Sequence, residues 1–206
     1  GEEGAHLDPS LFAALESVRP VWVIDPLDGT SNFAAGSGPI AVMVCLVQHG
    51  VTLASWIYDP VEHTMLRAEQ NCGAWLGDTR LRVGAFQGSP SQINGALSTK
   101  YLPPALRPAA ESGALGLGVT RASGCAGYDY RALACGKYQF LFYYRTLIWD
   151  HAPGVLIARE AGALADRYNE RPYTPVNQDA VGLLCATDRN TWRTVQKAVI
   201  PGSAAT

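Results

Sequence analysis

The chain has 206 residues, 48% of them hydrophobic and 17% charged, and its formal net charge is −2. Such a composition is typical of a soluble globular protein that can bury a sizeable core. The small net charge argues against nucleic acid or an anionic membrane as a partner, and the apolar runs are too short to span a bilayer. The five cysteines form no CxxC pair, which favours reduced thiols in a cytoplasmic protein.

The first part of the chain predicts a helical turn followed by a β-meander. The turn is expected at residues 9–18 and the strands at 21–24, 39–50, 51–60 and within 63–83. The apolar runs on either side of His49-Gly50 predict an antiparallel hairpin, because both are rich in β-branched and aromatic residues. Gly73 and Gly77-Asp78 mark further turns of the same meander.

A polar, turn-rich stretch near residues 87–92 marks the predicted boundary between two lobes, 1–90 and 91–206. In the second lobe we expect strands and helices in alternation, at 95–100 (strand), 128–140 (helix), 140–144 (strand), 150–163 (helix), 180–187 (strand) and 189–199 (helix). Because both halves mix strands and helices, the predicted class is layered α/β or α+β.

Two acids follow the apolar run VWVI in the stretch VWVIDPLDGTSNF. Asp25 and Asp28 flank Leu27, whose carbonyl adds a third oxygen; such hard ligands suit Mg²⁺ or Mn²⁺. Gly29 and Thr30 come next and predict a helix N-terminus that faces an anion. Metal ligands beside backbone amide donors describe a phosphate site. The alternative is an Asx-type turn that caps a helix.

Further acids occur in LIWDHAPG and in GEEG. Asp150 ends a strand-like run and starts a helical one, so by itself it is predicted to be an N-cap. Glu2 and Glu3, taken alone, are predicted to be a solvated terminus. Both interpretations change only when these acids are considered together with the first motif.

Taken together, the motifs resemble those of the inositol monophosphatase family of metal-dependent, lithium-sensitive phosphatases. DPLDGTSNF (25–33) resembles the first hallmark of that family, and WDHAPGVLIAREAGA (149–163) resembles the second. GEE (1–3) is similar to the acidic motif that precedes the first hallmark. RASGCAGYDYRALACGKY (121–138) follows a further family pattern, with Cys125 where the family has serine.

The resemblance implies a fold and a cofactor. The fold would be an αβαβα sandwich of the sugar-phosphatase type, with the site between the lobes and a homodimer as the usual assembly. We expect this chain to lack the family's N-terminal helical segment. The cofactor would be two or three Mg²⁺ ions, with Mn²⁺ as the alternative. By resemblance, the metal ligands are Glu2, Asp25, Asp28, Asp150 and the Leu27 carbonyl.

The resemblance also implies roles for individual residues. Catalysis would involve Glu2, Thr30 and Asp25, with Glu2 and Thr30 orienting the attacking water. Gly29 and Thr30 would bind the phosphate. The substrate-binding residues would be Gly124, Cys125, Ala126, Tyr143 and Asp150.

Tyr143 departs from the family pattern. Family members that act on inositol phosphate have a glutamate at this position, where it binds substrate hydroxyls. A phenol cannot accept hydrogen bonds from two sugar hydroxyls, although it can stack on a flat ring or donate one bond. The expected function is therefore Mg²⁺-dependent hydrolysis of a phosphate monoester of a small polar metabolite. The substrate stays open among inositol phosphate, 3′-phosphoadenosine 5′-phosphate, histidinol phosphate and fructose bisphosphate.

Two rival hypotheses remain. Haloacid-dehalogenase-type phosphatases use the pattern DxDGT, in which the first aspartate is a nucleophile. Here the acids are spaced DxxDGT, one residue too far apart. The second rival is a homologue that binds metal but turns over weakly, and acts as a regulatory or interaction protein.

Overall fold

A computed structural model describes residues 1–119, 121–177 and 182–200 of the chain. Its α-helices are α1 (Glu2–Leu7), α2 (Thr30–Ala34), α3 (Arg107–Ala114), α4 (Ala126–Ala134), α5 (Ile148–Glu160) and α6 (Arg189–Val199). Two 3₁₀ segments, η1 (Pro9–Glu16) and η2 (Pro90–Gln92), accompany them. Over the same residues, every helix is too short or too polar to cross a membrane.

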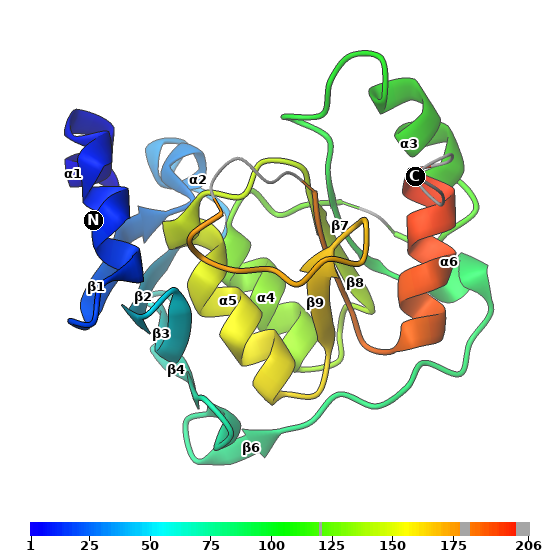
Figure 1. The fold of residues 1–206 in the computed structure, drawn as a ribbon. Coiled ribbons are helices and arrows are strands. Elements are labelled where there is room, and N and C mark those ends of the chain that lie inside the picture. The colour runs from blue at the N-terminus through cyan, green and yellow to red at the C-terminus, as the bar shows by residue number, and fades with distance from the viewer. Residues whose placement is uncertain (120, 178–181, 201–206) are drawn as a thin grey trace.

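Four layers follow one another across the molecule (Figure 1). A six-stranded sheet lies at one side, α4 and α5 lie next to it, and a four-stranded sheet follows. Helices α3 and α6 cover the far side of the second sheet. This alternation of sheets and helices confirms the predicted layered α/β class of the sugar-phosphatase type. The division into lobes 1–90 and 91–206 stays a prediction.

The first sheet is an antiparallel meander. Its strands are β1 (Val21–Asp28), β2 (Ala41–Gln48), β3 (Val51–Asp59), β4 (Thr64–Glu69), β5 (Gly73–Leu76) and β6 (Thr79–Leu81), adjacent in that order. His49 and Gly50 both have positive φ, of 50° and 71°, as a tight turn between twisted strands requires. The predicted hairpin at His49-Gly50 is confirmed, and so is its continuation through residues 63–83.

Strand β1 does not stop before the acids, so the prediction that it ends at residue 24 is wrong. The strand runs on to Asp28, and its register against β2 shifts between Asp25 and Asp28. Pro26 falls in this irregular stretch, where a missing N–H costs no ladder hydrogen bond. The bulge therefore places the two carboxylates on the same buried side of the strand.

The second sheet has the order β7-β8-β10-β9, with β7 (Gly95–Ser98), β8 (Phe140–Tyr143), β9 (Leu164–Arg167) and β10 (Leu183–Ala186). Strands β7 and β8 are parallel, and the other pairs are antiparallel. The sequence predicted β7, β8, β10, α4, α5 and α6. It missed β9 and α3, which are short and carry weak periodicity, and the start of α5 lies two residues earlier than predicted.

Helix α5 forms the centre of the core, since ten of its thirteen residues are buried. It crosses α4 closely at Gly154, where an added Cβ would lie 2.0 Å from the ring of Tyr130. On the other face of the six-stranded sheet, the apolar side chains of Trp22, Ile24 and Met65 are exposed. One core cluster therefore lies between the two sheets, and a second lies between the four-stranded sheet and helices α3 and α6.

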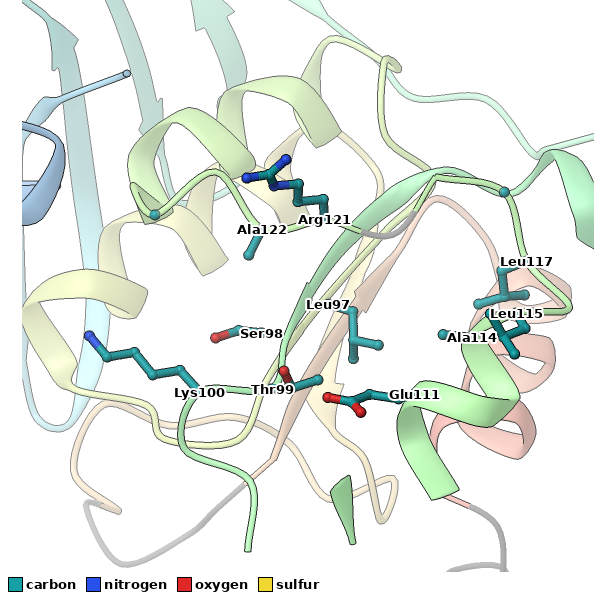
Figure 2. Close-up of a pocket in the computed structure, with 12 residues that line it drawn as sticks. Leu97, Ser98, Thr99, Lys100, Glu111, Ala114, Leu115, Leu117, Arg121 and Ala122 are labelled. Carbon is teal, nitrogen blue, oxygen red and sulfur yellow. The ribbon is translucent and has the colours of Figure 1, made fainter. Parts of the chain in front are cut away.

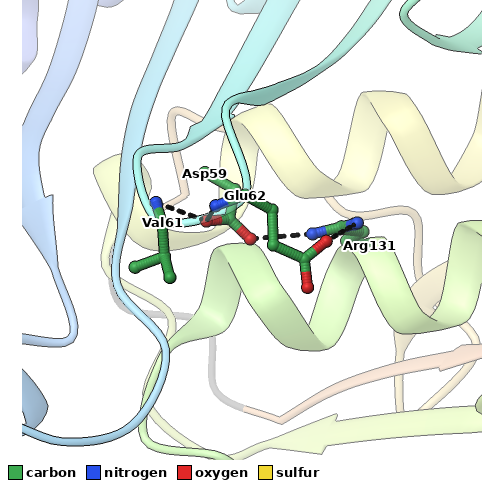
Figure 3. A network of polar contacts seen from close by, with 4 residues as sticks. All are labelled: Asp59, Val61, Glu62 and Arg131. Atoms are coloured by element: carbon green, nitrogen blue, oxygen red, sulfur yellow. Dashed lines mark hydrogen bonds and ion pairs between the residues drawn. The ribbon is translucent and has the colours of Figure 1, made fainter.

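A polar network joins the turn after β3 to α4 (Figure 3). Asp59 accepts hydrogen bonds from the backbone N–H groups of Val61 and Glu62, at 2.9 Å each. The Arg131 guanidinium of α4 donates to Asp59 at 2.7 Å and to Glu62 at 2.5 Å. Because Asp59 and Arg131 are largely buried, this ion pair fixes α4 on the sheet that carries the first acid motif.

Candidate active site

The first acid motif folds so that both carboxylates are buried. Asp25 is 2% exposed and Asp28 is 8% exposed. Asp25 Oδ1 accepts a hydrogen bond from Leu27 N at 2.9 Å, so the predicted Asx-type turn is present, but it does not cap a helix through Asp25. Asp28 Oδ2 accepts from Gly127 N at 2.7 Å and from Cys125 Sγ at 3.1 Å. Asp28 thus joins the first motif to the start of α4.

Asp150 lies in the first turn of α5, and the N-cap is Leu147, so the prediction that Asp150 itself caps the helix is wrong. Its carboxyl lies close enough to that of Asp25 for the two groups to influence each other's pKa. Burial, followed by the charges of Asp28 and Asp25, raises the pKa of Asp150 to about 8. Glu2, in α1, adds to this effect. The acids from three separate segments therefore act on one another.

The pKa values of Asp25 and Asp28 are also raised, in both cases chiefly by burial. Their other neighbours are hydrogen-bond donors and further carboxylates, including Glu3 beside Asp25. Buried carboxylates that repel one another are stabilised by a cation, and hard oxygen donors fit Mg²⁺. By donor chemistry the residues fit such an ion. Within the described residues, however, no three acidic, cysteine or histidine side chains converge as a ready ligand shell.

Gly29 and Thr30 lie directly after these acids. Gly29 has φ of +86°, and an added Cβ would lie 2.8 Å from the carbonyl oxygen of Pro39, so only glycine fits. Helix α2 begins at Thr30, as predicted, and Thr30 is exposed. Asn32 Nδ2 donates to Pro39 O at 2.8 Å and to Ser123 O at 3.2 Å. The first motif is thereby attached to the segment that precedes α4.

The residues predicted to contact the substrate before α4 differ in their surroundings. Gly124 lines a cavity. The Cys125 thiol is 1% exposed and is directed to Asp28. Ala126 starts α4 and is buried. Sequence reasoning missed the part of Gly127, whose N–H bonds Asp28 and whose lack of a side chain lets α4 approach Ala41 of β2.

Tyr143 lies at the end of β8 and is buried. Its hydroxyl donates to Asp129 Oδ2 at 2.6 Å, and its ring contacts the rings of Tyr130 and His151. Burial raises the pKa of Asp129 to about 6. Sequence reasoning missed Asp129, although an acid at the start of the helix predicted at 128–140 could have indicated it.

Comparison with known proteins shows which family has a similar sequence. The model of the inositol monophosphatase family matches residues 1–200. A Nus factor SuhB of Xylella fastidiosa is 34% identical over 151 residues, or 70% of this chain and 54% of the relative. An inositol-1-monophosphatase of Rhizobium meliloti is 32% identical over 149 residues, or 68% and 54%. The chain spans about half the length of these curated relatives.

Solved structures with the same fold are also found. The extragenic suppressor protein suhB of Bartonella henselae aligns with a TM-score of 0.80 at 25% identity, covering 89% of this chain and 71% of that one. Inositol monophosphatase II of Staphylococcus aureus aligns with a TM-score of 0.81 at 22% identity, covering 94% and 74%. The second likeness, being under 25% identical, concerns the fold alone.

Proposed function

The chain belongs to the inositol monophosphatase family, and we propose that it hydrolyses a phosphate monoester of a small polar metabolite with the help of Mg²⁺. One observation carries this proposal. Asp25 and Asp28 from β1 are buried, and their charges add to burial in raising the pKa of the half-buried Asp150 from α5. Uncompensated carboxylates beside a glycine-threonine turn favour a cation together with a phosphate.

Asp25, Asp28, Asp150, Glu2 and the carbonyl of Leu27 are the proposed metal-binding groups. When bound, Mg²⁺ would supply polarisation of the phosphoryl oxygens, a lower pKa for water and compensation of charge on the leaving alkoxide. Mn²⁺ would serve the same donor set.

The remaining residues of the motifs bind and orient the reactants. The backbone at Gly29 and the hydroxyl of Thr30 would bind phosphate oxygens, and Thr30 with Glu2 would orient the attacking water. Thr30 is exposed, so its hydroxyl is accessible to a ligand. Gly127 and Cys125 hold Asp28 in place through the hydrogen bonds described above. No covalent phosphoenzyme is required, unlike in the DxDGT phosphatases.

The proposal is tested by measuring phosphate release from a panel of metabolite monoesters with Mg²⁺, with Mn²⁺ and with EDTA. The panel contains inositol 1-phosphate, histidinol phosphate, fructose 1,6-bisphosphate and 3′-phosphoadenosine 5′-phosphate. Turnover that requires the metal supports the proposal, and millimolar lithium is expected to inhibit it. Turnover that persists in EDTA, or a phospho-aspartate trapped at Asp25, would contradict it.

A second candidate function is regulatory, because several curated relatives are named Nus factor SuhB. In that case the chain would bind metal or a partner without hydrolysing phosphate monoesters. Mn²⁺ binding with no turnover over the whole panel would favour this candidate. A homodimer and a cytoplasmic location stay predictions, which sedimentation and cell fractionation would test.

A further inference from the structure

The turn at residues 123–125, just before α4, is tied to the first acid motif by two hydrogen bonds. Asn32 Nδ2 donates to the carbonyl oxygen of Ser123 at 3.2 Å, and Cys125 Sγ donates to Asp28 Oδ2 at 3.1 Å. The turn is closed on itself, since Ser123 Oγ donates to Cys125 O at 2.9 Å and accepts from Cys125 N at 3.2 Å. Its backbone is therefore held in one conformation beside the motif.

Gly124, at the centre of this turn, has backbone groups that a ligand could use. Within the described part of the chain, neither its N–H nor its C=O has a hydrogen-bond partner. Gly124 lines a cavity of about 590 Å³, whose lining also includes Ser98, Lys100, Arg121 and Ala122 (Figure 2). An added Cβ at Gly29 would lie 3.2 Å from Cβ of Cys125, so the turn adjoins the predicted phosphate-binding glycine. An ester whose phosphate lies at Gly29 would therefore have its leaving group within reach of Gly124.

On its other side the turn is held by Asp129 of α4. Ser123 N lies 3.3 Å from Asp129 Oδ1 and 3.4 Å from Oδ2, so its N–H is shared between the two oxygens. The Tyr143 hydroxyl donates to Oδ2 at 2.6 Å. Asp129 is 1% exposed, and over residues 1–119, 121–177 and 182–200 no cationic side chain lies within 4.0 Å of it. The orientation of this buried carboxyl group therefore depends on its hydrogen-bond donors.

Tyr143 is itself a rigid donor. It pairs with Ser98 across β8 and β7, and its ring is buried. The ring centroid lies 4.7 Å from that of His151 and 6.3 Å from that of Tyr130. A hydroxyl fixed in this way, donating a short hydrogen bond to a carboxylate, fixes the carboxylate in turn. The contacts thus run from β8 through Asp129 to the 123–125 turn.

We propose that Tyr143 and Asp129 are positioning residues for the leaving group of the substrate. The Tyr143 hydroxyl orients the Asp129 carboxyl group, which holds the 123–125 turn so that the backbone groups of Gly124 face the leaving group. This inference rests on the proposed function and adds residues to its site. A shift of about 1 Å in a positioning group can cost about 10²-fold in rate, so loss of the Tyr143 hydroxyl should be felt at the substrate.

Three variants test the two residues. Tyr143→Phe removes the hydroxyl and keeps the ring, Asp129→Ala removes both acceptor oxygens, and Asp129→Asn keeps one. For the panel ester that is hydrolysed best, kcat/KM should fall about tenfold or more in Tyr143→Phe. The affinities for inorganic phosphate and for Mn²⁺ should stay within about twofold in this variant, because its groups act on the leaving group. Asp129→Asn should retain more activity than Asp129→Ala.

Tyr144→Phe is the matched control, since it removes a hydroxyl next to the same strand end but outside these contacts. The double variant Tyr143→Phe/Asp129→Ala should be no slower than Asp129→Ala, because both residues act through one hydrogen bond. Losses that simply add would overturn the inference. Amide exchange by NMR gives a readout that needs no substrate: the Ser123 N–H should exchange faster in Tyr143→Phe than in wild type or Tyr144→Phe.

The outcomes separate this inference from the proposed function. Metal-dependent turnover with an unchanged kcat/KM in Tyr143→Phe would overturn the inference and uphold the function. If wild type hydrolyses no ester of the panel, the proposed function fails, and calorimetry in Mn²⁺ then compares the affinity for inositol 1-phosphate with that for inorganic phosphate. A selective loss of ester affinity in Tyr143→Phe would still support the positioning role. Equal ester affinities, or no ester binding by wild type, would overturn it.

Discussion

The Tyr143 hydroxyl donates a 2.6 Å hydrogen bond to Asp129 Oδ2, and both residues are buried at the end of β8 and the first turn of α4. The hydrogen bond lowers the pKa of Asp129, but burial outweighs it and the net pKa rises to about 6. A tyrosine at this position thus serves the packing of α4 against the sheet. Its hydroxyl is engaged by Asp129, and a contact of Tyr143 with the substrate stays a prediction.

The raised pKa of Asp129 predicts a pH dependence of stability. A carboxyl with a raised folded-state pKa stabilises most below its ordinary pKa of 3.8, and this contribution is lost as the pH rises through about 6. Between pH 4 and 7.5, the unfolding free energy should fall by about 2 kcal/mol more in wild type than in Asp129→Asn. Urea unfolding in EDTA at each pH measures the unfolding free energy of both proteins.

Tyr143→Phe tests the same pH dependence of stability from the side of the hydrogen-bond donor. Its loss of the donated hydrogen bond should move the pKa of Asp129 further up, so the pH-dependent fall in stability shifts to higher pH. Identical pH profiles of the unfolding free energy for wild type and Asp129→Asn would contradict this prediction. They would show that burial does not raise the pKa of Asp129 in solution.

Neutralising a carboxylate of the candidate site should separate metal binding from folding. Asp28→Asn and Asp150→Asn are each expected to weaken Mn²⁺ binding and to lower turnover by about 10²-fold or more. The metal-free fold should be at least as stable, because a repelling charge is removed from a buried place. Calorimetric Mn²⁺ titration, turnover and urea unfolding are compared with those of Asp78→Asn, whose carboxylate is exposed. Near-normal Mn²⁺ binding in both site variants would refute the ligand assignment.

The sequence predicted the fold best where the pattern was long and regular. The hairpin at His49-Gly50 and the helix at 189–199 were predicted because alternation and helical spacing extend over eight residues or more. The continuation of β1 through Asp28 was missed, because a proline and two acids are typical of a strand end. Only pairing with β2 reveals the bulge that keeps them in the sheet.

The sequence indicated which residue types form the candidate site, but not the hydrogen bonds that hold them together. The first motif indicated Asp25 and Asp28 because they lie beside Gly29 and Thr30, whereas Asp150 was indicated only by the resemblance of WDHAPGVLIAREAGA to the second family hallmark. The hydrogen bonds from Cys125 and Gly127 to Asp28 join residues almost a hundred positions apart. No local pattern encodes such a contact, and the cavity at Lys100 and Arg121 depends on the same long-range packing.

The ion pair between Arg131 and Asp59 should contribute measurably to stability. The Arg131 and Asp59 side chains are 15% and 13% exposed, and removing the arginine leaves a largely buried carboxylate. Arg131→Met should therefore lower the unfolding free energy by about 2 kcal/mol or more. The control is Asp78→Asn, which breaks the 4.0 Å pair of Asp78 with Arg67 at the surface and should change little. Equal urea midpoints for Arg131→Met and wild type would show that the pair is fully solvated.

The close crossing of α4 and α5 leaves no room for a side chain at Gly154. An alanine there would place its Cβ 2.0 Å from Cδ2 of Tyr130, whose side chain is completely buried. Ala normally stabilises a helix interior by about 1 kcal/mol relative to Gly, but forced overpacking costs about 1 to 3 kcal/mol or more.

Gly154→Ala should therefore lower the melting temperature by several degrees, against the direction of helix propensity. It should also reduce turnover, because α5 carries Asp150 and would have to move away from α4. Gly84→Ala is the matched control, since Gly84 has no atom within 4 Å of an added Cβ and should melt at or slightly above the wild-type temperature. If Gly154→Ala melts at the temperature of Gly84→Ala, the two helices are not in contact at this position in solution.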